Sequence, residues 1–187
     1  MGRRLVGLTL AGLALGFPTV ASAKPVKLTE GSAAIAFDVD FGVKLVQFGV
    51  TPGAIAPSVQ DGLTVTSPLR SGSTVRPDGS KAIIKTSGGA SQVGDTFDVE
   101  LEDLRFIIRG KRAKLSALTE INGVLTDRFN FATGVAKKAG RAKGGYAATD
   151  LTLRLNDIGA ATLNSQLGTT DFAVGELIGV ATITARR

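Results

Sequence analysis

The chain has 187 residues and a formal net charge of +6, and it contains 24 glycines but no cysteine and no histidine. These absences exclude a Ser-His-Asp triad, a thiol nucleophile, a disulfide framework and any metal site held by histidine or cysteine. The composition therefore favours a protein that binds rather than an enzyme.

Residues 1–23 have the pattern of a secretory signal peptide. The pair Arg3-Arg4 precedes an apolar segment over 5–17 that is too short to span a bilayer, and small residues over 21–23 fit a cleavage site. We favour general secretion over the twin-arginine route, which the arginine pair also suggests. Residues 24–187 are then expected to form a single β-rich domain, secreted or associated with the cell envelope, with no transmembrane segment after cleavage.

Apolar and polar residues alternate along most of the remaining chain, and a period of two predicts β-strands. The predicted strands cover 35–41, 63–66, 82–85, 97–101, 104–108, 111–121, 124–131, 146–155 and 178–184. Asn122-Gly123 predicts a tight hairpin, because both central residues of such a turn adopt positive φ. Short strands separated by Gly- and Asp-rich turns indicate an all-β, mainly antiparallel fold, either a sandwich or an open barrel.

One segment departs from this period and predicts a short helix near 157–167. Asn156 or Asp157 is a suitable N-cap, apolar residues then recur at helical spacing, and Gly168 provides the stop. The segment 43–48 has a weaker form of the same pattern.

Two clusters of basic residues form the first candidate binding surface. One cluster comprises Arg109, Lys111, Arg112 and Lys114, and the other comprises Lys137, Lys138, Arg141 and Lys143, in a Gly- and Ala-rich segment over 137–145 that we expect to be a mobile loop. If 111–131 is a hairpin, both clusters lie at one end of the sheet, where they would attract an anionic envelope polymer or surface protein. Solubility and protection of edge strands would also explain them. These loops lack the aromatic residues of nucleic-acid-binding loops, which argues against nucleic acid.

The acidic residues are weaker candidates for a functional site than the basic clusters. Asp98, Glu100 and Glu102 alternate along one predicted strand, which makes a row and not the cage that calcium requires, and Asp95 and Asp103 flank that row. A solvated strand face, paired with nearby arginines, explains the row better. A hydrolase based on two carboxylates would need acids across a cleft. The sequence marks no such pair, and we assign no catalytic residue and no metal ligand.

Tyr146 is the only tyrosine, and a phenolate can ligate haem iron. A lone tyrosine at the start of a strand is more often a sheet residue with its hydroxyl at the surface. The residues alone therefore predict no cofactor, although haem is a candidate.

The order of short motifs along the chain resembles a known family. The motifs are Gly31-Ser32, the turn over 86–89, the strands over 95–101, 104–108 and 114–117, the segment 160–164, Phe172, Gly175 and the strand from Ile178. Together they resemble the haemin-transport-associated (Hta-type) domain of secreted and surface proteins from actinobacteria. The resemblance implies a β-rich, exported fold that binds haem through tyrosine and histidine ligands. This chain departs from it, because Thr86 stands where related sequences are expected to have a histidine.

Three functions remain open. The first is an exported binding or structural domain of the cell envelope, without enzymatic activity, that contacts an anionic partner through its basic loops. The alternative is a haem-binding or haem-relay domain with Tyr146 as the ligand, and the third is a carboxylate-based hydrolase.

Overall fold

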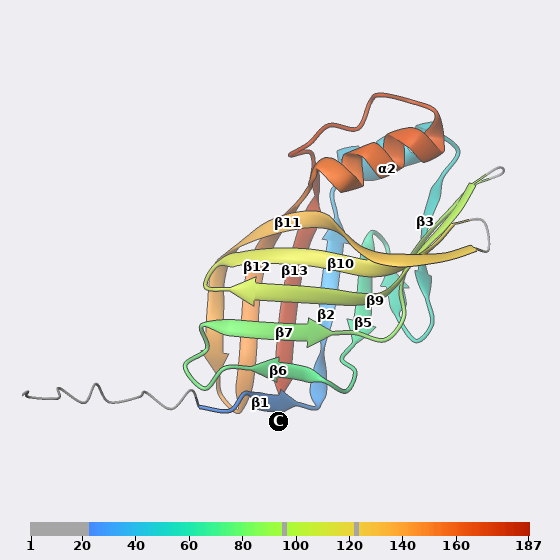
Figure 1. The fold of residues 1–187 in the computed structure, drawn as a ribbon. Helices are drawn as coiled ribbons and strands as arrows, with labels where there is room; N and C mark the ends of the chain where they lie inside the picture. Colours follow the sequence, from blue (N-terminus) through green and yellow to red (C-terminus); the bar gives the residue numbers. More distant parts are fainter. Residues whose placement is uncertain (1–22, 95–96, 122–123) are drawn as a thin grey trace, which may run out of the picture.

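The computed structural model describes residues 23–94, 97–121 and 124–187 (Figure 1). The predicted signal peptide lies outside the described residues except for Ala23, and it stays a prediction. Within these ranges, the helices lack the combination of length and hydropathy that crossing a membrane requires.

Thirteen strands and two helices make up the described chain. The strands are β1 (Val26–Leu28), β2 (Glu30–Phe37), β3 (Thr51–Ile55), β4 (Val59–Asp61), β5 (Thr64–Pro68), β6 (Ser73–Val75), β7 (Lys81–Lys85), β8 (Gly89–Gly94), β9 (Phe97–Arg109), β10 (Arg112–Ile121), β11 (Val124–Ala142), β12 (Gly145–Leu155) and β13 (Leu177–Arg186). The helices are α1 (Val39–Gln47) and α2 (Asp157–Leu167).

The strands form one antiparallel sheet in the order β1-β6-β7-β9-β10-β11-β12-β13-β2-β5-β4, and β8 and β3 branch from β9. The sheet curls on itself, so that β6, β7, β9 and β10 run across in front of β12, β13 and β2 (Figure 1). A bridge between Leu69 and Thr86 links the chain after β5 to the chain after β7. The all-β prediction is confirmed, and the curled sheet corresponds to the open barrel of the two architectures left open.

Inward-facing apolar residues of the two halves form one core, which includes Phe106, Leu115 and Leu153, each at most 1% exposed. Two long strands keep their apolar residues inside by means of local irregularities. Asp103 in β9 and Asp150 in β12 have φ of 50° and 51°, where the left-handed conformation shifts the alternation by one residue. The predicted strands 97–101 and 104–108 are consequently one strand.

The prediction of a mobile loop over 137–145 is wrong, because strand β11 occupies most of this segment. The strand continues to Ala142, and only Lys143 and Gly144 form the turn to β12. Earlier in the same strand, a Cβ at Gly134 would lie 2.8 Å from Leu151 Cδ1, so the glycine lets the side chains of β12 pack closely against β11. The expected hairpin between 111 and 131 is present, with Ile121 opposite Val124, although Asn122-Gly123 itself lies outside the described residues.

Both helices are fixed at their amino ends by side-chain caps. Asn156 Oδ1 accepts a hydrogen bond from Gly159 N at 2.8 Å, so helix α2 begins and ends as predicted. The strand predicted over 35–41 is wrong beyond Phe37, where β2 ends, because helix α1 begins at Val39. The Asp38 carboxylate accepts from the amides of Asp40 and Phe41 at 3.1 and 3.3 Å, and this cap starts a helix where alternation alone predicts strand.

Removing either cap is expected to destabilise the protein modestly. Asp38→Ala and Asn156→Ala should each lower the free energy of unfolding by about 1 kcal/mol, because each leaves helix amides without an acceptor. Urea unfolding followed by circular dichroism measures the change, with the exposed Asp61→Ala as a control. Unchanged stability in both variants would contradict the assigned caps.

Candidate functional site

An apolar pocket lies at the end of the barrel that carries both helices. Its cavity volume is about 50 Å³, and its mouth is partly open to solvent. Its lining comes from β2, α1, β9, β11, β12, α2 and β13 and comprises Phe37, Phe41, Val99, Leu101, Phe129, Phe131, Leu155, Gly159, Thr162, Leu163 and Ile178. Thr162 is the one polar side chain among these described residues, so the pocket suits an apolar ligand.

Strand β11 supplies two aromatic rings to this pocket. Phe129 and Phe131 are two residues apart and therefore face the same side of the strand. Their ring centroids are 6.4 Å apart at an interplanar angle of 72°, an edge-to-face arrangement, and both side chains are half-buried. Aromatic surface at a partly open pocket is available for stacking with a flat ligand.

Helix α2 approaches β11 closely enough to form the other wall. A Cβ on Gly159 would lie 2.2 Å from the carbonyl oxygen of Phe131, a distance that no real Cβ tolerates. The same oxygen accepts a hydrogen bond from Asn156 N at 3.2 Å. The absence of a side chain at Gly159 is thus what lets α2 lie against the strand that carries the two rings.

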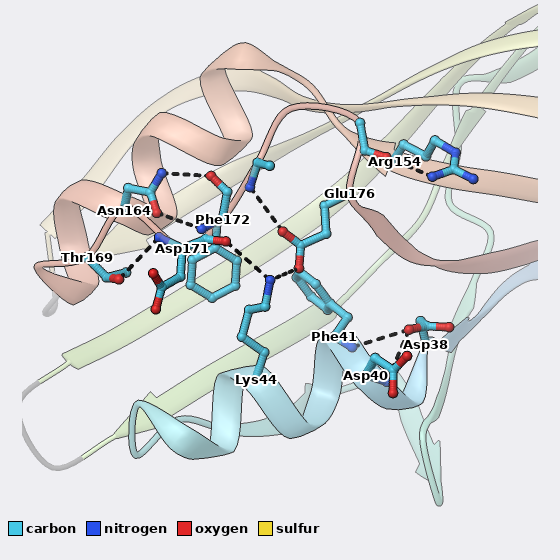
Figure 2. A network of polar contacts seen from close by, with 12 residues as sticks. Asp38, Asp40, Phe41, Lys44, Arg154, Asn164, Thr169, Asp171, Phe172 and Glu176 are labelled. Atoms are coloured by element: carbon cyan, nitrogen blue, oxygen red, sulfur yellow. Dashed lines mark hydrogen bonds and ion pairs between the residues drawn. The ribbon is translucent and has the colours of Figure 1, made fainter.

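A polar and aromatic network joins α1 to the segment that follows α2 (Figure 2). The Phe172 ring packs edge-on against Phe41 at 6.1 Å, and Lys44 Nζ lies 5.2 Å from the Phe172 ring centroid. Lys44 also forms an ion pair with Glu176. Asn164 on α2 donates to Phe172 O at 2.8 Å and accepts from Phe172 N at 3.0 Å. These contacts hold both helices over the end of the barrel.

A second, wider groove lies on the outer face of β9 to β12. Its volume is about 870 Å³, it is open to solvent, and three of the predicted basic residues line it, namely Arg109, Arg112 and Lys114. Arg154 from β12 joins them, a residue that the sequence analysis missed. The pairing of Thr133 with Arg154 brings it there, and this register could not be read from the sequence.

The other predicted basic residues lie elsewhere. Lys111 is in the turn between β9 and β10, and Lys143 is in the turn after β11. Lys137 lies 4.0 Å from the Asp150 carboxylate, and neither it nor Lys138 or Arg141 lines the groove. The structure therefore brings three residues of the first cluster together on a sheet face and leaves Lys111 and the second cluster outside the groove.

Comparison with known proteins identifies the architecture. No family model and no curated protein matches the sequence. Among solved structures, the C-terminal domain of HtaA from Corynebacterium glutamicum matches with a TM-score of 0.68 at 14% identity, covering 85% of this chain and 97% of that domain. The N-terminal domain of HtaA matches with the same score and identity over 87% of this chain and all of that domain. This chain has the Hta fold.

A third structure with the Hta fold, described as the heme binding protein HtaB of Corynebacterium glutamicum, matches with a TM-score of 0.59 at 12% identity, covering 87% of this chain and 96% of that one. Sequence identities this low show that the fold is shared, but they do not show that a ligand or an activity is shared. The resemblance seen in the sequence motifs is therefore confirmed for the fold.

In this Hta fold, Tyr146 does not reach the apolar pocket. It lies in β12 opposite Arg141 and Ala185, nine residues before the pocket residue Leu155, which is roughly 30 Å along a strand. Its side chain is 1% exposed, so the expected surface hydroxyl is wrong. Desolvation by burial raises the pKa of Tyr146 to about 12.

The described acidic residues form no metal site within the Hta fold. No group of three potential ligands occurs among the described residues, where Asp95 and the side chain of Asp98 are not included. Asp103, which flanks the acidic row, forms an ion pair with Arg70. Neither described pocket is lined by a carboxylate, so the hydrolase hypothesis gains no support.

Proposed function

We propose that this chain is a non-enzymatic binding domain that takes a flat tetrapyrrole of the haem class into its apolar pocket and holds it by the faces of the ring. The observation that carries the proposal is the pocket itself, in which aromatic rings from β2, α1 and β11 surround space beneath two capping helices. Support comes from the shared Hta fold, since one protein of that fold is described as heme-binding.

The proposal differs from the earlier alternative in the role of Tyr146. Haem iron is held in proteins by histidine, cysteine, methionine or tyrosine. The chain lacks histidine and cysteine, its one methionine is Met1, and Tyr146 is buried far from the pocket. The pocket lining matches the apolar faces of a porphyrin in chemistry but offers no axial ligand, so affinity must come from apolar burial and ring stacking. Because the cavity holds only about 50 Å³, the two helices that cover it must move apart before the ring can enter.

Export of the domain is part of the same proposal. The amino-terminal pattern Arg3-Arg4 followed by an apolar segment supports secretion or association with the cell envelope.

The test compares haemin with metal-free protoporphyrin, each titrated into the purified chain and followed by absorbance and porphyrin fluorescence. We expect both to bind with about equal affinity, because the iron contributes no bond to a side chain. Phe129→Leu and Phe131→Leu, which keep apolar volume but remove a ring, should each weaken binding by about tenfold. Tyr146→Phe is the matched control and should leave both affinities unchanged.

Two results would overturn the proposal. One is the absence of binding by either porphyrin to a chain whose circular dichroism shows an intact sheet. The other is binding of haemin alone with a charge-transfer band that disappears in Tyr146→Phe, which would restore tyrosine ligation.

A further inference from the structure

The outer groove on β9 to β12 has a different chemistry from the apolar pocket, and it lies on the opposite face of the sheet. Four cationic side chains, Arg109, Arg112, Lys114 and Arg154, line it, and the remaining lining is mostly small or polar. Four neighbouring strands about 4.8 Å apart spread these charges over roughly 14 Å across the sheet.

Strand register accounts for the cluster. Arg112 and Lys114 alternate with Ala113 and Leu115, which are 5% and 1% exposed, so both basic side chains face outward. Arg112 lies directly opposite Arg109 on β9. Like charges placed directly opposite each other on neighbouring strands destabilise a sheet, so this pair is not explained by folding.

Two ordinary explanations for surface cations, edge protection and neutralisation by nearby acids, do not account for this groove. Protection of edge strands does not apply, because β9 to β12 lie inside the sheet, whose path ends at β1 and β4. Neutralisation by neighbouring acids does not apply either. Within the described chain, Lys44, Arg70 and Lys137 pair with carboxylates, whereas Arg109, Arg112 and Lys114 form no ion pair.

From this charge complementarity we propose that the groove is a docking site for a linear, base-free phosphate polymer of the cell envelope. Arginine forks bind phosphate oxygens in pairs, and a row of cations over several strands matches repeated phosphates better than a single ion. Thr133 and Thr152 on the groove floor supply hydroxyl groups for further hydrogen bonds. No aromatic side chain is among the described lining residues, so stacking of nucleic-acid bases has no platform.

The experiment measures binding of the purified chain to inorganic polyphosphate at several salt concentrations. The groove variant carries Arg112→Glu and Lys114→Glu. The matched control carries Lys138→Glu and Lys143→Glu, which change the net charge equally but lie outside the groove. We expect the groove variant to lose at least about tenfold in affinity and its salt dependence to fall by roughly one unit per removed contact, while the control stays within about twofold.

Four results would overturn the proposal. They are absence of polyphosphate binding, an equal loss in the control, tighter binding to single-stranded DNA of matched phosphate number, and tighter binding to vesicles of phosphatidylglycerol. The first would leave no phosphate site in the groove, and the second would leave only net charge as the cause of binding. The last two would assign the groove to nucleic acid or to a lipid surface. Porphyrin titration of the groove variant keeps this outcome separate from the proposed function, since it should be unchanged.

Discussion

Tyr146→Ala is expected to lower the free energy of unfolding by about 3–5 kcal/mol, the loss typical of truncating a large buried side chain. Tyr146 is 1% exposed and belongs to the same core as Leu151 and Ile183, so the truncation leaves a cavity between the two halves of the curled sheet. Urea unfolding measures the loss. A change below about 1 kcal/mol would contradict a core role, since cavities of this size cost more.

The same residue gives a pH test. Burial raises the pKa of Tyr146 from 10.0 to about 12, so the folded state favours the neutral phenol. The stability from this group is complete below pH 10 and is lost as pH rises toward 12. Because the chain has one tyrosine and no tryptophan, tyrosinate absorbance reports this group alone. Titration at an ordinary tyrosine pKa in the folded protein would contradict the burial.

Gly159→Ala is expected to destabilise the protein by about 1–3 kcal/mol and to weaken porphyrin binding by about tenfold. The added Cβ would lie 2.2 Å from Phe131 O, so α2 must move away from β11 and alter the pocket wall. Urea unfolding and porphyrin titration measure the two effects.

Gly42→Ala is the matched control for this substitution. Gly42 is also a buried helical glycine, but its added Cβ would meet Leu63 Cδ2 at an ordinary 3.7 Å. We expect Gly42→Ala to be neutral or to stabilise the protein by up to about 1 kcal/mol, because alanine favours helix. Equal effects of the two substitutions would show that close approach of α2 to β11 does not shape the pocket.

Much of the fold could be predicted from local patterns. Alternation identified the strands around Val65, Ile84 and Leu153, and Asn156 and Gly168 marked both ends of α2. These signals are local, since a strand face or a helix cap depends on residues a few positions apart. The weak helical pattern over 43–48 indicated only the second half of helix α1, because the first residues of the helix alternate like a strand. The Asp38 cap decides between the two structures.

The two candidate sites depend on contacts that the sequence does not encode locally. Phe129 and Phe131 look like ordinary core residues until α2 is placed over them. Arg154 reaches the basic groove only through the register of β11 with β12. Tyr146 illustrates the opposite error, because its residue type suggested a ligand and its position places it in the core. Tertiary placement, not residue type, decides each of these assignments.

The most direct test of the tetrapyrrole-binding proposal is a methyl NMR spectrum of the chain with and without metal-free protoporphyrin. A porphyrin ring shifts the signals of methyl groups that lie against its faces. We expect the largest shifts at Leu101, Leu155 and Leu163, which line the pocket, and unchanged signals at Val135 on the outer groove. Shifts concentrated at Val135, or near Tyr146 at Ala148, would contradict the proposal.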